Sequence, residues 1–159
     1  MAEKKESRSD LFTNYRALVA KVDAFCVRVV REYRTYLECR RGCDACCRHL
    51  TLFPVEGMAL RAAWRRLPKA ERDALAPGIA AASAAGPCPL LEKGDCLLYE
   101  ARPIICRTHG LPLLYRKESE VRTTCCPLNF KGLERLPGAA VLDMEVVNAS
   151  LAAINALFV

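Results

Sequence analysis

Four cysteines crowd the stretch "CRRGCDACC", which runs from Cys39 to Cys47 and ends in the adjacent pair Cys46 and Cys47. A cysteine thiolate is a soft metal ligand and also a nucleophile and a partner in disulfide exchange. Adjacent cysteines are poor disulfide partners for each other, because the usual bridge needs Cα atoms farther apart than neighbouring residues normally allow. The residue types and their spacing therefore favour metal binding or redox chemistry over a local disulfide.

Further cysteines extend the pattern along the chain. The sequence has ten cysteines in 159 residues, and nine of them fall in three separated groups. A metal site requires such groups, because the ion draws together segments that are distant in the sequence. The tenth, Cys26, lies beside the apolar Phe25 and Val29, so we assign it to the core as a small hydrophobic side chain. We predict that the metal ligands are Cys39, Cys43, Cys46, Cys47, Cys88, Cys96, Cys106, Cys125 and Cys126.

The two adjacent pairs, Cys46–Cys47 and Cys125–Cys126, favour a polynuclear site. Side chains of neighbouring residues usually diverge, so both members of a pair serve most easily if they bind different ions; otherwise one is a spectator. Nine thiolates would suit three tetrahedral zinc ions, since six terminal and three bridging sulfurs make the twelve bonds required. A single [4Fe–4S] cluster would use four thiolates and leave five over. The count leans toward zinc without deciding the metal.

The sequence gives no sign of export or membrane insertion. Its start, "MAEKKESRSD", is charged, and no later stretch reaches the roughly 18 apolar residues of a spanning helix. We therefore expect a cytoplasmic protein with reduced thiols and no membrane partner. The net charge of +6 supports only non-specific association, so a nucleic acid is not the favoured partner and a protein is.

Three stretches, "CRRGCDACCR", "CPLLEKGDCLLYEARPIICR" and, more loosely, "CCPLNF", cover about Cys39 to Phe130. They resemble the YkgJ-type cysteine-cluster family, which is named for a C-x-x-C-x-x-C-C motif and described as a zinc- or iron-chelating domain. One spacing departs from the motif, because three residues separate Cys39 from Cys43, which makes Cys39 the least secure ligand of its group. Some larger proteins similar in this domain are flagellin lysine methylases. The resemblance thus implies that the module can serve iron–sulfur-dependent methyl transfer.

Other side chains near the cysteines are weaker candidates. His109 follows Cys106 by three residues and His49 follows Cys47 by two, but nine thiolates leave little need for imidazole, so a surface or outer role is favoured for both. Six arginines lie within a few residues of a cysteine, where their charge would help to hold thiolates deprotonated. They are Arg40, Arg41, Arg48, Arg102, Arg107 and Arg122.

Three functions stay open on this basis. The first is a metal-binding protein whose zinc or iron–sulfur centre has a redox, metal-handling or accessory role. The second is an enzyme, or enzyme subunit, that uses an iron–sulfur centre for methyl transfer to a protein substrate. The third is a structural zinc module that contacts a protein or nucleic acid. The chain shows no G-x-G-x-x-G after a strand, so no catalytic residue can be assigned.

The apolar pattern predicts a mainly α-helical single domain over residues 9–159, after a flexible N-terminus of residues 1–8. Apolar residues from Leu11 to Tyr33 recur at steps of three and four, which is typical of an amphipathic helix, here over 9–37 with Ser9 or Asp10 as its N-cap. Another helix with this spacing is predicted over 139–157.

Between these two helices we predict shorter elements around the cysteines. Pro54 and Pro103 each begin a helix, and the alanine-rich segment 68–86 forms one that is broken near Pro77. Residues 39–49 form a loop around the metal, residues 93–95 a tight turn, and residues 111–124 a small hairpin turning at 117–120. The cysteine-rich loops are expected to wrap around a metal site at one end of the helical scaffold.

Overall fold

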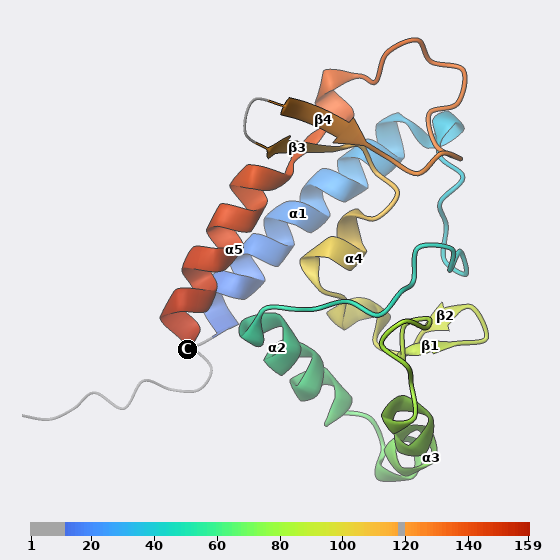
Figure 1. Cartoon of the computed structure of the whole chain (residues 1–159), viewed down its shortest axis with the longest axis vertical. Coiled ribbons are helices and arrows are strands. Elements are labelled where there is room, and N and C mark those ends of the chain that lie inside the picture. The colour runs from blue at the N-terminus through green and yellow to red at the C-terminus, as the bar shows by residue number, and fades with distance from the viewer. Residues whose placement is uncertain (1–11, 118–119) are drawn as a thin grey trace, which may run out of the picture.

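Helices α1 (Thr13–Glu32) and α5 (Met144–Phe158) lie side by side and run in opposite directions (Figure 1). The computed structural model describes residues 12–117 and 120–159. At one end of the pair the rings of Phe12 and Phe158 lie 5.5 Å apart between centroids, and near the other Arg28 donates a hydrogen bond to the carbonyl of Ala139. The predicted N-terminal segment 1–8 and the predicted N-cap at residue 9 or 10 lie outside the described residues.

The core lies between these two helices and the segments packed on them. Val22 and Val29 of α1 are buried at a spacing of seven residues, which places them on one face. Cys26 lies between them on the same face and packs against both buried clusters, as predicted for a small hydrophobic side chain. The larger cluster contains Tyr15, Val22, Val55, Ile104, Leu113, Met144, Val147 and Leu151, and the smaller one Val29, Leu111, Phe130 and Ala140.

The predicted hairpin is present as β3 (Leu113–Lys117) paired antiparallel with β4 (Glu120–Thr124), and its two turn residues, 118 and 119, are not described. A third strand, β5 (Leu142–Asp143), pairs parallel with β3 and was not anticipated. The predicted helix over 139–157 is wrong at its start, because residues 138–140 form a 3₁₀ turn (η4, Gly138–Ala140) and α5 begins only at Met144. Asp143 fixes that start, since its carboxylate accepts a hydrogen bond from the backbone N–H of Glu145.

Helix α2 (Pro54–Trp64) begins at its proline, as predicted. The alanine-rich segment forms α3 (Lys69–Ala80), and the predicted break at Pro77 is wrong because the helix continues through that residue. A proline removes one helical hydrogen bond and crowds the carbonyl four residues before it. Here α3 ends three residues after Pro77 and buries none of its side chains, so few contacts constrain how it relaxes around the ring.

Short elements carry the remaining cysteines. The tight turn at residues 93–95 joins β1 (Leu91–Glu92) to β2 (Asp95–Cys96), and its central residues Lys93 and Gly94 both have positive φ, as a two-residue hairpin turn requires. A 3₁₀ turn, η3 (Tyr99–Ala101), leads into α4 (Ile104–Thr108), which follows Pro103 as predicted and packs on α1. Residues 39–49 contain no helix, and their one β contact is an isolated bridge from Arg48 to Pro87.

The first helix ends five residues before the predicted residue 37. Helix α1 stops at Glu32, and one 3₁₀ turn, η2 (Arg34–Tyr36), follows before the cysteine-rich loop begins. The structure is thus mainly α-helical, with two short-stranded sheets where the sequence predicted at most one hairpin. Within the described residues, no helix combines the length and the apolar character that crossing a membrane demands.

Candidate metal centre

The cysteine segments lie on the side of the molecule that carries α4 and the β1–β2 hairpin, away from α5 (Figure 1). All ten cysteines are free thiols. Backbone hydrogen bonds, together with the charges that act on Cys39, Cys46, Cys47 and Cys106, group eight of them into two sets of four, which are joined by an interaction between Cys46 and Cys47. The first thiol group consists of Cys39, Cys43, Cys46 and Cys126, and the second consists of Cys47, Cys88, Cys96 and Cys106.

Asn129 holds the first thiol group together. Its side-chain N–H donates to Cys39 Sγ at 3.2 Å and to the carbonyl of Gly110 at 2.6 Å, while its oxygen accepts from the backbone N–H of Cys39 at 3.3 Å. The backbone N–H of Cys126 donates to the same Gly110 carbonyl at 3.4 Å. Because Asn129 is itself buried, this arrangement fixes Cys39 beside Cys126, although 87 residues separate them.

The position of Cys39 requires a glycine at residue 110. Gly110 has φ +87°, and a Cβ atom there would lie 2.5 Å from Cys39 Sγ and 3.2 Å from the side-chain nitrogen of Asn129. The sulfur therefore occupies the space that any other residue would need for its side chain. Cys39, which the departing motif spacing made the least secure ligand, is thus one of the most firmly placed thiols of the group.

Cys43 and Cys46 approach Cys39 and Cys126 from an exposed loop of two successive turns. The backbone N–H of Cys43 donates to the backbone carbonyl of Arg40, and that of Cys47 donates to the backbone carbonyl of Asp44. Burial raises the pKa of Cys46, and the charges of Cys43 and Cys126 raise it further.

Cys39 is affected in the same way. Burial raises the pKa of its thiol most, the Asn129 N–H lowers it, and the charges of Cys126 and Cys43 raise it. Cys39 and Cys46 are thus affected by the same two thiols, Cys43 and Cys126.

Backbone hydrogen bonds connect the chain segments that carry the second thiol group. The backbone N–H of Cys88 donates to the carbonyl of Cys47 at 3.2 Å, and that of Leu91 donates to the carbonyl of Cys88 at 3.0 Å. Leu91 in turn pairs with Cys96 across the β1–β2 hairpin. The pKa of Cys106 is raised to about 12. Burial is the largest cause, and the charges of Cys88, Cys96 and Cys47 raise the pKa further. Three backbone segments and α4 therefore meet at these four thiols.

Arg107 attaches this second group to the scaffold. Its guanidinium donates to both carboxylate oxygens of Asp23 on α1, at 2.9 and 2.7 Å, and to the carbonyls of Arg102 and Glu100, each at 2.6 Å. The side chain of Arg107 is only 10% exposed. It thereby fixes α4, and with it Cys106, to α1 and to the turn that follows Cys96.

Arg102 supplies positive charge to the same group. Its guanidinium lies 3.6 Å from the centre of the Tyr99 ring, and its charge lowers the pKa of Cys96 and of Cys106 against the larger effect of burial. Six arginines lie near cysteines in the sequence. Of these, Arg102 and Arg107 have clear roles at the thiols.

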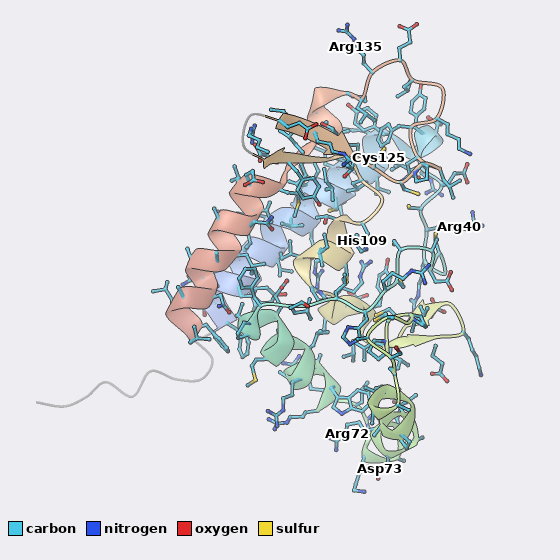
Figure 2. The ribbon with its side chains drawn as sticks, viewed as in Figure 1. Arg40, Arg72, Asp73, His109, Cys125 and Arg135 are labelled. Carbon is cyan, nitrogen blue, oxygen red and sulfur yellow. The ribbon has the colours of Figure 1, made fainter. Side chains whose placement is uncertain are left out.

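Four cysteine or histidine residues that the sequence analysis considered belong to neither thiol group. Figure 2 shows Cys125 at the end of β4 and His109 at the end of α4. Burial and the neighbouring Cys126 raise the pKa of Cys125, which joins neither group of four. His109 is half-buried, and burial lowers its pKa; His49 is exposed. Cys26 donates its S–H to the carbonyl of Arg107 at 3.6 Å from within the core.

The thiols of each group come from converging segments, but they are not yet close enough to coordinate a metal ion. Among residues 12–117 and 120–159, no three ligating side chains are placed closely enough to hold a metal ion as they stand. Zinc binds thiolate sulfur at about 2.3 Å, so the loops must close to form a site. The donor set fits such an ion, because each group supplies soft thiols, and a cation would offset the burial and the repulsion that raise the pKa of Cys47 and of Cys106. Closing would also add to folding stability.

Comparison with protein families also supports metal binding. The model of the CxxCxxCC family, described as a putative zinc- or iron-chelating domain, matches residues 38–128. This chain belongs to that family. The match spans more than half of the chain and includes all nine predicted ligands, so it confirms the resemblance seen in the sequence and supports metal binding. Searches of curated proteins and of solved structures returned no match.

Sequence reasoning missed the residues that position the thiols. Asn129 lies within the "CCPLNF" stretch that carried part of the resemblance, yet nothing in its spacing indicated a bond to Cys39, 90 residues away. The Gly110 requirement depends on the same distant contact. Glu56 was missed as well: one carboxylate oxygen accepts from the N–H of Phe53 and the other from that of Ile104, which joins α2 to the start of α4.

Proposed function

We propose that this chain is a metal-binding protein whose clustered thiolates hold more than one ion of zinc, or iron–sulfur, and that the centre has a redox, metal-handling or accessory role. One observation carries the proposal. Eight free thiols from distant chain segments gather on one side of a helical scaffold, anchored by the buried Asn129 and by Arg107, whose side chain is 10% exposed. Such a donor set matches zinc and iron, which prefer thiolate sulfur to the oxygen ligands chosen by magnesium or calcium.

The exposure of the thiols favours a centre that another molecule can reach over one that is enclosed in the core. Here Cys43 and Cys46 are exposed, and the loop from residue 39 to residue 50 buries no side chain. A metal held there would be within reach of a partner's ligands or of an electron donor. We propose a protein as that partner.

The residues around the thiols would tune such a centre. The Asn129 N–H donates to Cys39 Sγ, and hydrogen bonds to thiolate sulfur change the potential of an iron–sulfur cluster or the donor strength toward zinc. Arg102 favours the thiolate form at Cys96 and Cys106. When bound, the metal would supply either electron transfer or an exchangeable ion, and these side chains would set how easily it does so.

Purification without oxygen, followed by elemental analysis and an absorption spectrum, tests the proposal. Iron with acid-labile sulfide and broad visible absorption would identify an iron–sulfur centre, whereas colourless protein with stoichiometric zinc would identify a zinc centre. Protein that contains neither metal, and that fails to take up zinc or to be reconstituted with iron and sulfide, would contradict the proposal.

A further inference from the structure

We infer that the eight thiols form two separate four-thiolate metal sites that abut at the Cys46–Cys47 peptide, with one member of that pair in each site. The inference rests on the proposed function, namely that the chain binds metal. It replaces a single polynuclear cluster of nine thiols with two complete sets of four. The first site consists of Cys39, Cys43, Cys46 and Cys126, and the second of Cys47, Cys88, Cys96 and Cys106.

Separate backbone contacts build the two sites. The second depends on the hydrogen bond from Cys88 to Cys47, the pairing of Leu91 with Cys96, and the neighbouring bridge between Arg48 and Pro87. The first depends on the Gly110 carbonyl and Asn129, which join Cys39 to Cys126. The two sets of contacts share no residue.

The adjacent pair is the boundary between these two frameworks. The Cys47 carbonyl accepts the hydrogen bond from Cys88, which commits Cys47 to the second site. Cys46 lies in the turn from Asp44 to Cys47, directly after Cys43 and in the loop that begins at Cys39, so it is left to the first site. The charges of Cys43 and Cys126, which raise its pKa, agree with this assignment. The thiols of Cys46 and Cys47 also interact with each other, so the two sites lie next to each other rather than at opposite ends of the domain.

The donor count closes without bridging sulfurs. Four thiolates complete a tetrahedral zinc ion or anchor one [4Fe–4S] cluster, so each set of four is sufficient by itself. Cys125 is then superfluous, which agrees with its place beside Cys126 but outside both frameworks. Three zinc ions bridged by nine thiolates would need Cys125 as a ligand.

Zinc stoichiometry of double variants separates the two arrangements. Protein is stripped of metal, reloaded with zinc alone, and its zinc-to-protein ratio is measured. We expect two equivalents in the unaltered chain, one in Cys126→Ser and one in Cys96→Ser. A same-site pair, Cys39→Ser with Cys126→Ser, should still hold one. A cross-site pair, Cys96→Ser with Cys126→Ser, should hold none. Cys125→Ser is the matched control and should keep both.

The outcomes distinguish this inference from the function on which it rests. No zinc in the unaltered chain, together with no iron after reconstitution with iron and sulfide, contradicts the proposed function itself; if the chain takes up iron alone, the same variants are compared by the number of clusters per chain. Zinc binding with equal losses in the same-site and cross-site pairs, a ratio other than two, or a loss in Cys125→Ser overturns the two-site arrangement only. X-ray absorption of the zinc-loaded, unaltered chain is independent of variant folding. It should show four sulfur neighbours and no short zinc–zinc distance, and such a distance would establish bridging thiolates.

Discussion

Helices α1 and α5 bury apolar side chains along their whole contact, whereas no residue between 39 and 50 is buried at all. The helical pair is therefore stabilised by the removal of apolar surface from water. The cysteine loops depend on single hydrogen bonds, on two buried polar anchors and, as we propose, on metal. The difference indicates that the scaffold exists before the metal binds, while the ends of the loops are completed by it.

Metal removal should have the largest effect, and it should lower amide protection in the loops but not in the helices. We expect a chelator to strip amide protection from residues 39–50 and 86–97, because these loops have few apolar contacts of their own. Protection should persist in α1 and α5, and also in β3, whose Leu113 belongs to the larger core cluster. Hydrogen exchange with and without zinc measures this, and re-addition of zinc should restore the protection. Equal protection of the loops in both states would contradict the prediction.

The scaffold was largely predictable from the sequence, and the loops were not. Apolar residues at steps of three and four indicate an amphipathic helix because the helix repeats every 3.6 residues, and α1 and α5 were found in this way. The start of α5 was missed, since β5 forms only through pairing with a strand about 30 residues earlier. The identity of the thiols followed from their residue type and spacing.

Their division into groups could not be predicted in the same way. It depends on contacts such as Asn129 with Cys39, in which neither residue type nor spacing specifies the partner. A single sequence fixes which groups can bind metal, but the pairing of distant segments emerges only when the chain is folded. Cys125 and Cys126 illustrate the point, because their adjacent positions look equivalent in the sequence and differ in the structure.

Substitution of Gly110 tests how closely the scaffold and the first thiol group fit together. Gly110→Ala should lower the free energy of unfolding by about 3 kcal/mol, because it combines a left-handed backbone with overpacking against a sulfur atom. Gly132→Ala is a matched control, since Gly132 also has positive φ (+78°) but a Cβ there meets nothing within 4 Å. It should cost about 1 kcal/mol, from the backbone alone.

Denaturant unfolding and zinc content of both glycine variants provide the measurement. Only Gly110→Ala should lose zinc, because only there is Cys39 displaced. Similar losses of stability and of zinc in the two variants would show that the backbone conformation, rather than contact with the thiol, determines both effects.

Arg107 connects the two regions from the side of the second thiol group. Arg107→Ala should lower the free energy of unfolding by about 2 kcal/mol, less than for a fully buried pair because the side chain of Asp23 is 43% exposed. It should also weaken zinc binding at Cys106, which α4 no longer positions. Lys69→Ala, which removes an exposed pair with Asp73 on α3, should change stability by about 0.5 kcal/mol at most and leave zinc unaffected. Equal effects of the two variants would contradict a positioning role.

Cys26 should give the smallest effect and so define where the thiol sites end. It packs against both core clusters and its S–H donates to the carbonyl of Arg107, so its thiol lies in the core, apart from both thiol groups. Cys26→Ala should lower the free energy of unfolding by about 1 kcal/mol, through lost packing and the lost contact with the Arg107 carbonyl. Zinc content should be unchanged, whereas Cys47→Ala should remove one equivalent. If Cys26→Ala also lost zinc, the core of α1 would have to take part in metal binding, and the separation between scaffold and thiol loops would fail.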